Sequence, residues 1–314
     1  MQIPRFFKYN AQASLGVSGP DALEFLQGQF SNDLSSIAVG QVVYGLWLDR
    51  KGKIVADSFV LRRGEESFTL LSYFCESSAI LDRLDAYLVM EDAELAASSE
   101  RAPAVAIWGE QAQSSACEAL GLETPDRGGF AENGDVVAFW GRRGSESVLE
   151  VVNLREDESS RFVELVSQLS EMGAVELTLD EATALAIESK VPQIGRGFGD
   201  ADLPQELSLE VDAVSFRKGC YLGQEVMARL HAMGRVRKGL KVMGIEGSTT
   251  ISEKSLPLDL VDDAGKRFGQ LRSVAYSKSG GIGLGVVSHG FVGQRLFAGE
   301  VEVTLYQEKD KSDG

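Results

Sequence analysis

The sequence is poor in the residues that build metal sites and disulfide frameworks. Its 314 residues include three cysteines and two histidines. Cys75, Cys117 and Cys220 are far apart and odd in number, which argues against a disulfide framework and favours a reducing compartment. Together with His231 and His289 they form no CxxC or HxxxH pair, so we predict no metal site.

Long apolar runs and an excess of positive charge are also lacking. No segment has the length of a signal peptide or a membrane span, so we expect a cytoplasmic protein that does not enter a membrane. The chain has 31 Lys and Arg against 47 Asp and Glu, a net charge of −16. This charge argues against direct binding of nucleic acid over the whole surface, because like charges repel, although it leaves room for a local basic patch.

The motifs of several common enzyme classes are absent. The glycine-rich segments 195–199 and 281–285 lack the GxGxxG spacing of a dinucleotide-binding turn. The Gly-Lys pairs at 52–53 and 265–266 lack the rest of a P-loop, and no GxSxG elbow exists. These absences exclude the usual dinucleotide-binding, P-loop and serine hydrolase classes.

Up to about residue 237 the pattern alternates between short strands and helices. A length of 314 residues also suggests two or three packed domains. The irregular units and one hairpin favour small α+β layers of the ferredoxin-like type. The predicted strands are 13–17, 42–48, 54–61, 68–72, 104–108 and 148–152, and the predicted helices are 20–29, 78–90, 112–120 and 159–172.

Beyond residue 237 the helical periodicity disappears. Short apolar runs at 240–245, 251–260, 267–276, 283–287 and 299–305 are separated by turn residues. This pattern is typical of a small all-β barrel or sandwich. We therefore divide the chain into a composite α+β region, residues 1–240, and a β-barrel, residues 241–314.

One window differs from the rest of the chain in its charge. Residues 217–238 contain six basic residues and one acid, a net charge of +5, which leaves −21 for the remainder. A cationic segment in so acidic a chain is suited to an anionic ligand or partner. The alternative is a solvated helix face that acids elsewhere balance, which is the commoner outcome for charge runs.

Cys220 lies in this window and is our candidate for a reactive thiol. Arg217 and Lys218 precede it, and a helix is expected to begin near Gly223; both features stabilise a thiolate. The alternative is a small buried hydrophobic residue, as most free cysteines are. Cys75 and Cys117 have no such neighbours, and we assign both to the core.

Three segments carry a resemblance to a known family. Residues 218–225 read KGCYLGQE, which resembles the KGC[YF]xGQE signature of the YgfZ family, relatives of the glycine-cleavage T-protein, an aminomethyltransferase. Residues 25–34, FLQGQFSNDL, and 51–57, KGKIVAD, resemble two further motifs of that family. The three segments lie in the family's order, so the resemblance covers nearly the whole chain.

The resemblance implies a fold and a role. The fold would have two interleaved ferredoxin-like α+β lobes and a C-terminal β-barrel around a central hole that admits tetrahydrofolate. The role would be that of a folate-binding accessory protein in iron–sulfur cluster assembly or repair, with the assembly machinery and client iron–sulfur enzymes as partners. Through such a client it would affect tRNA modification by methylthiolation. Cys220 would be the functional thiol.

The resemblance also suggests residues for the folate. Glu188, in AIESKVP, stands where family members have RxEAGxP, and a carboxylate can accept paired hydrogen bonds from a pterin. The Arg, Ala and Gly of that pattern are replaced by Ala186, Ser189 and Lys190, which puts the folate affinity in doubt. Asp57 matches the T-protein aspartate that assists one-carbon transfer, although a strand-end carboxylate without a catalytic role is the simpler interpretation.

The remaining candidates for folate binding come from the motifs themselves. They are Asn32, Asp33, Lys218, Tyr221, Gln224 and Arg229. Asn32 and Asp33 could equally satisfy backbone groups at a helix end.

Two other functions remain open at this stage. The first is a true tetrahydrofolate-dependent aminomethyltransferase. The cysteine signature argues against it, because the T-protein reaction needs no thiol. The second is an RNA-binding module that uses the basic window. The net charge of −16 and the lack of an aromatic RNP motif argue against it.

Overall fold

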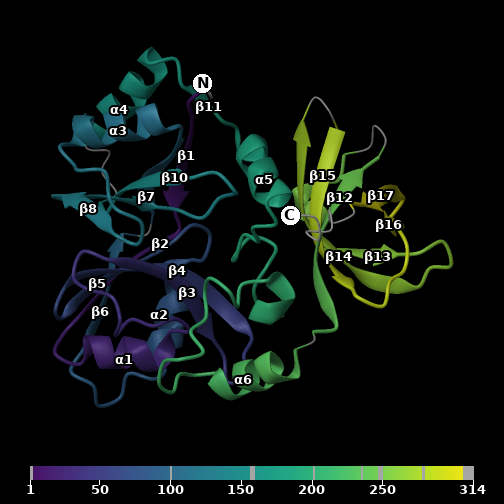
Figure 1. Ribbon diagram of the computed structural model, residues 1–314, viewed down its shortest axis with the longest axis horizontal. Coiled ribbons are helices and arrows are strands. Elements are labelled where there is room, and N and C mark those ends of the chain that lie inside the picture. The colour runs from purple at the N-terminus through teal and green to yellow at the C-terminus, as the bar shows by residue number, and fades with distance from the viewer. Residues whose placement is uncertain are drawn as a thin grey trace, which may run out of the picture.

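The computed structural model describes residues 3–99, 101–155, 160–200, 202–234, 236–246, 250–277 and 280–306. They form three lobes, two of mixed α and β structure and a third built of strands, as Figure 1 shows. This arrangement confirms the predicted α+β fold with a C-terminal barrel. The barrel begins at Lys238, and residues 307–314 lie outside the described part.

The first lobe is a five-stranded antiparallel sheet with helices on one face. The strand order is β3-β4-β5-β2-β6. Helices α1 (Ala22–Gln29) and α2 (Ser77–Asp85) cover it through a core that includes Leu26, Trp47 and Leu84. Its strands are β2 (Ala13–Ser18), β3 (Val42–Leu48), β4 (Ile54–Gly64), β5 (Ser67–Ser72) and β6 (Glu94–Ser99).

The second lobe is a six-stranded sheet in the order β11-β1-β7-β10-β9-β8. Helices α3 (Glu110–Leu120) and α4 (Ser160–Glu171) pack on its outer face. Its strands are β1 (Arg5–Ala11), β7 (Ala102–Trp108), β8 (Phe130–Asn133), β9 (Val136–Trp140), β10 (Val148–Asn153) and β11 (Val175–Glu176).

The two lobes are interleaved along the chain and share a core. Strand β1 belongs to the second sheet, β2 to β6 to the first, and the chain then returns to the second. Phe59 and Leu71 of the first sheet pack against Val137 and Phe139 of the second. The order of layers is therefore helices, sheet, sheet, helices, as Figure 1 shows with α3 and α4 on one side and α1 and α2 on the other.

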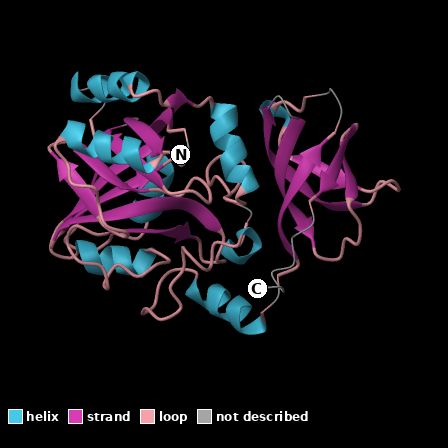
Figure 2. Ribbon diagram, turned by 45° about the horizontal axis from the view of Figure 1, so that its top comes forward, coloured by secondary structure: helices cyan, strands magenta, loops and turns pink. Residues whose placement is uncertain are grey.

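The third lobe is a closed barrel, and two helices connect it to the others. Its strands are β12 (Lys238–Ile245), β13 (Leu258–Val261), β14 (Arg267–Ser277), β15 (Gly280–Ser288), β16 (Arg295–Ala298) and β17 (Val301–Leu305). Helix α5 (Leu179–Glu188) packs against β14, and α6 (Gln224–Met233) leads into β12. Figure 2 shows helices on the first two lobes and mainly strands in the third.

Most predicted elements are confirmed, and the errors have local causes. The strand predicted at 251–260 is wrong, because a 3-10 helix (Glu253–Ser255) occupies its middle and only β13 is extended. The helix predicted at 78–90 ends at Asp85, since the amides of Tyr87 and Leu88 bond three residues back. Strands β1, β6, β8, β9, β11 and β16 were not predicted.

Candidate functional site

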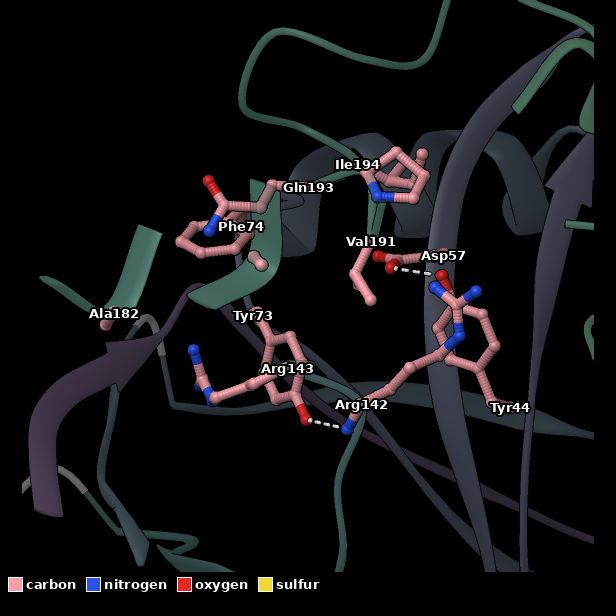
Figure 3. Close-up of a pocket in the computed structure, with 12 residues that line it drawn as sticks. Tyr44, Asp57, Tyr73, Phe74, Arg142, Arg143, Ala182, Val191, Gln193 and Ile194 are labelled. Atoms are coloured by element: carbon pink, nitrogen blue, oxygen red, sulfur yellow. Dashed lines mark hydrogen bonds between the residues drawn. The ribbon is translucent and has the colours of Figure 1, made fainter. Parts of the chain in front are cut away.

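A pocket lined by both charged and apolar side chains lies where the two α+β lobes meet α5. Its walls come from β3 and β4, the segment after β5, the loop between β9 and β10, one face of α5 and residues 191–194. Figure 3 shows the side chains that line it. Asp57 is the predicted site residue that lies in this pocket.

Asp57 is buried on β4 and is held by three donors. Its Oδ2 accepts a hydrogen bond from the Tyr44 hydroxyl at 2.8 Å. Its Oδ1 accepts from the Ser72 hydroxyl at 2.7 Å and from the Cys75 thiol at 3.4 Å. Burial raises the pKa of Asp57, and the three donors and Arg142 offset part of that rise. The donors leave one acceptor position on Oδ2.

Arg142 places a positive charge beside Asp57. Its guanidinium lies over the Tyr44 ring, 5.1 Å from the ring centre, and its Nη2 is 3.3 Å from a carboxylate oxygen of Asp212. Figure 3 shows Arg142 and Tyr44 on the same side of the pocket as Asp57. This end of the pocket therefore offers both a hydrogen-bond acceptor and a cation.

A buried charge pair forms the other end of the pocket. The Nε of Arg143 donates to Oε1 of Glu150 at 2.7 Å, and Glu150 is fully buried on β10. The hydroxyls of Tyr73 and Tyr9 also donate to Glu150, each at 2.8 Å. Burial alone would lower the pKa of Arg143, but Glu150 and the two tyrosines raise it overall. Arg143 therefore stays charged.

Gly141 allows this charge pair to form at the end of β9. A Cβ atom at this position would lie 2.3 Å from Oε1 of Glu150 and 2.6 Å from the Tyr73 hydroxyl oxygen. Both groups are fixed by their hydrogen bonds, so a larger residue cannot be accommodated without displacing the network.

The pocket is narrow in this structure. Its cavity volume is about 20 Å³, enough for one ordered water molecule. A bicyclic ring enters only if part of the wall moves, and Figure 3 shows Val191 between the Asp57 end and the Arg143 end.

The three family-like segments, 25–34, 51–57 and 218–225, meet at a different place, around the start of α6, which we call the Cys220 junction. The Leu222 amide donates to the Gly28 carbonyl at the end of α1. Gly223, with a φ of +87°, packs against the hairpin turn at Gly52. A Cβ atom on Gly223 would lie 2.8 Å from the Asp49 carbonyl oxygen. Glycine is required here by both the positive φ and the close approach.

Lys218 is buried beneath this junction. Its Nζ donates to the carbonyl oxygens of Gln27, Phe30 and Asn32 at 2.7, 2.7 and 2.8 Å, which satisfies the end of α1. Burial lowers the pKa of Lys218 to about 8. All three donors of the ammonium group are used within the protein.

Asn32 and Asp33 lie in the turn that follows α1, and their side chains form hydrogen bonds there. Asn32 donates to the carbonyl oxygens of Tyr44 and Asp212, which connects the turn to the pocket. Asp33 accepts from the Gln27 side chain and the Ser35 amide. Burial alone would raise the pKa of Asp33, but these hydrogen bonds lower it.

The remaining motif residues differ in their exposure. Cys220 is exposed, as the reactive-thiol hypothesis requires, but it does not line the Asp57 pocket. Tyr221 is buried in the core of the first lobe, and burial raises its pKa to about 12. Gln224 is the first residue of α6, and Arg229 is exposed on that helix.

Glu188 ends α5 and lines a second pocket together with Trp108 and Ser189. The structure therefore places Glu188 and Asp57 in separate pockets. Lys190 has a φ of +55°, a conformation that favours glycine. This finding explains why a glycine suits the corresponding position of the family pattern.

The basic window separates into different environments. Arg217, Arg229 and Arg237 are exposed, whereas Lys218 is buried. Lys238 lies 3.4 Å from a carboxylate oxygen of Glu206, and residue 235 is outside the described part. Fewer charges thus face solvent than the sequence count indicates.

Sequence reasoning missed Tyr44, Tyr73, Arg142, Arg143 and Glu150. One signal was present: Glu150 is the sole acid in the apolar run Val148–Val152. A charged residue in the middle of a buried strand needs a partner. The sequence does not show which basic residue provides it.

The described residues lack two kinds of feature. They contain no group of three or more His, Cys, Asp or Glu side chains arranged to hold a metal ion. No helix among them is long and apolar enough to span a bilayer.

Comparison with known proteins identifies the family. Residues 6–121 match the GCVT N-terminal domain. The chain is 31% identical to the tRNA-modifying protein YgfZ of Edwardsiella ictaluri, over 87% of this chain and 81% of that protein. The chain belongs to the YgfZ family. It is also 27% identical to human mitochondrial iron–sulfur cluster assembly factor IBA57, over 74% of this chain and 64% of that protein.

A solved structure agrees with this assignment at the level of the fold. The glycine cleavage system aminomethyltransferase T from Bartonella henselae superposes with a TM-score of 0.79. It covers 96% of this chain and 85% of its own, at 17% sequence identity. The YgfZ-family chain described here therefore has the three-lobed T-protein fold.

Proposed function

We propose that this protein binds a folate in the pocket between its first two lobes and acts as an accessory factor in iron–sulfur cluster assembly or repair. Its YgfZ-family relatives carry names that refer to tRNA modification and to cluster assembly. An effect on tRNA methylthiolation would then be indirect, through a client iron–sulfur enzyme. The observation that carries the proposal is the pocket that contains Asp57 and Arg142 in a T-protein fold.

The pocket's chemistry suits a pterin. A pterin edge presents both donors and acceptors, and the pocket offers the remaining acceptor position of Asp57 and the cations of Arg142 and Arg143. The cavity must widen to admit the ring, so we expect residues 191–194 to shift when folate binds. Tetrahydrofolate would supply or carry a one-carbon unit when bound.

Cys220 is the proposed functional thiol. It is exposed and follows Arg217 and Lys218, at a junction held by the buried Lys218 ammonium group. One cysteine supplies too few ligands to hold a cluster alone, so the thiol would act together with a partner from the assembly machinery.

The test is the activity of a folate-dependent iron–sulfur enzyme in cells that carry Cys220→Ala. We expect client activity to fall to the level of cells without the protein, at unchanged protein abundance. Cys117→Ala is the matched control, because Cys117 is buried in the second lobe. Full client activity with Cys220→Ala would remove the thiol from the mechanism.

The alternative is a tetrahydrofolate-dependent aminomethyltransferase, which the T-protein fold and the pocket position of Asp57 favour. Incubation with aminomethyl-lipoyl carrier protein and tetrahydrofolate separates the two functions. Formation of methylenetetrahydrofolate and ammonia, lost in Asp57→Asn, would establish the enzyme and displace the accessory role.

A further inference from the structure

One donor in the Asp57 pocket has no acceptor. The Nη2 atom of Arg143 is buried and makes no hydrogen bond within the described part of the chain. Arg143 is 5% exposed and lines the pocket. Figure 3 shows its guanidinium directed toward Ala182 and Phe74, away from Asp57. A buried N–H without a partner is destabilising, so an acceptor from a ligand would be stabilising.

The protein holds this guanidinium firmly. Its central carbon lies 4.0 Å from the ring centres of both Tyr9 and Tyr73, and these two rings are arranged edge to face. Its Nε is fixed by Glu150. The position of Nη2 is therefore fixed, and a fixed donor can make a specific contact with a ligand.

The charge balance indicates which acceptor suits it. Glu150 already neutralises Arg143 and is itself satisfied by three donors. A second carboxylate here would bring an unbalanced negative charge into a buried place, which is costly. A neutral carbonyl oxygen accepts the hydrogen bond without that cost.

We propose that Nη2 of Arg143 donates a hydrogen bond to the ring carbonyl of a bound pterin and so makes the site selective for oxo-pterins over amino-pterins. This inference rests on the proposed folate function. The ring, rather than the glutamate, reaches Arg143, because the two glutamate carboxylates would lose their hydration at this buried end. Asp57 and Arg143 then face one ligand from opposite ends of the pocket, one as acceptor and one as donor.

The experiment is calorimetric titration of the full chain with three ligands. They are tetrahydrofolate, its analogue with a 4-amino group in place of the 4-oxo group, and tetrahydropteroate, which lacks the glutamate. We expect the 4-amino analogue to bind about 10- to 100-fold more weakly than tetrahydrofolate, because it presents a donor to a donor. Tetrahydropteroate should keep the dependence on Arg143.

The double variant Arg143→Met, Glu150→Gln removes both charges and leaves no buried ion unpaired. It should bind the oxo and amino ligands with affinities within about threefold of each other, while thermal unfolding reports its integrity. The comparison of ligands on the wild-type chain needs no variant, so the proposal remains testable if the double variant does not fold.

The outcomes separate this inference from the proposed function. Equal affinity of the wild-type chain for the oxo and amino ligands would overturn the role of Arg143 and leave folate binding intact. If the affinity for tetrahydrofolate depended on Arg143 but the affinity for tetrahydropteroate did not, the acceptor for Arg143 would be a glutamate carboxylate and not the ring carbonyl. No binding of any of the three ligands would overturn both proposals.

Discussion

The Asp57 pocket and the Cys220 junction have opposite physical designs. The pocket gathers buried charges that satisfy one another, with Glu150 fully buried and Arg143 5% exposed. At the junction the candidate reactive group is exposed, whereas its neighbours Lys218 and Tyr221 are buried. We infer that the proposed ligand recognition in the pocket is coupled to folding, whereas the proposed thiol chemistry at the junction is nearly independent of folding.

The largest effect should come from breaking the buried pair in the pocket. Arg143→Met leaves the Glu150 carboxylate without its charge partner, so we expect the free energy of unfolding to fall by about 3–5 kcal/mol. Urea denaturation measures it. Arg295→Met, which removes an exposed ion pair of the barrel, should cause no measurable change and is the control.

The double variant with Glu150→Gln sharpens this result. Removal of both charges should recover most of the stability lost in Arg143→Met, because no uncompensated carboxylate remains. A loss as large as in the single variant would show that packing between Tyr9 and Tyr73 matters more than the charge.

The next effect should come from Lys218, whose buried ammonium group lies at the junction. Lys218→Met keeps the apolar stem but leaves three carbonyl oxygens without their donor, so we expect a loss of about 1–3 kcal/mol in the free energy of unfolding. Lys238→Met is the control, since Lys238 is about one-third exposed and its contact with Glu206 is longer. If both substitutions lowered the free energy of unfolding by the same small amount, Lys218 would contribute no more to stability than a partly exposed lysine.

Lys218 also predicts a pH dependence. Its pKa is lowered by burial from 10.5 to about 8 in the folded chain. Between these two values the unfolded chain binds more protons than the folded one, so this group makes the free energy of unfolding rise with pH. The difference between the wild type and Lys218→Met, measured at pH 7.5 and 9.5, should therefore grow. An unchanged difference would mean that the carbonyl oxygens keep the ammonium group charged in the folded chain over this pH range.

Sequence reasoning recovered the framework better than the pocket, and the reason is physical. Periodicity and turn residues report local structure, so β3, β4, β10, α1 and the barrel were predicted. Strand β1 was missed because the N-terminal segment pairs with β7, about one hundred residues away. Its partner strand is not visible from local composition.

The candidate site shows the same limit. Motif similarity located the exposed Cys220 and the residues that surround the end of α1. The pocket joins β3, β4, α5 and the loop after β9, and Tyr9 of β1 meets Glu150 only in three dimensions. Glu188, predicted to face the pterin, lines a different pocket, because it lies on another face of α5 from Ala182 and Ala186.

A smaller effect should appear at Lys190, in the turn that follows α5. Lys190 has a φ of +55°, a conformation that costs a non-glycine residue about 1–2 kcal/mol. Lys190→Gly should remove this strain, but glycine also gains conformational entropy in the unfolded chain, which offsets part of the gain. We therefore expect the free energy of unfolding to rise by no more than about 1 kcal/mol. Ser208, with a φ of +56°, provides a second site outside the pocket wall for the same substitution. Destabilisation by Lys190→Gly would indicate that the lysine side chain contributes more than the strain costs.

The smallest effect on stability should come from the residue with the largest proposed effect on function. Cys220 is exposed, so Cys220→Ala should change the free energy of unfolding by less than about 0.5 kcal/mol in urea denaturation under reducing conditions. Cys117→Ala should cost more, about 1 kcal/mol, because Cys117 is 1% exposed within the second lobe. If Cys220→Ala were the more destabilising of the two, the thiol would be part of the fold, and the contrast between pocket and junction would fail. If it is neutral, any loss of client activity in Cys220→Ala cells must come from the chemistry of the sulfur.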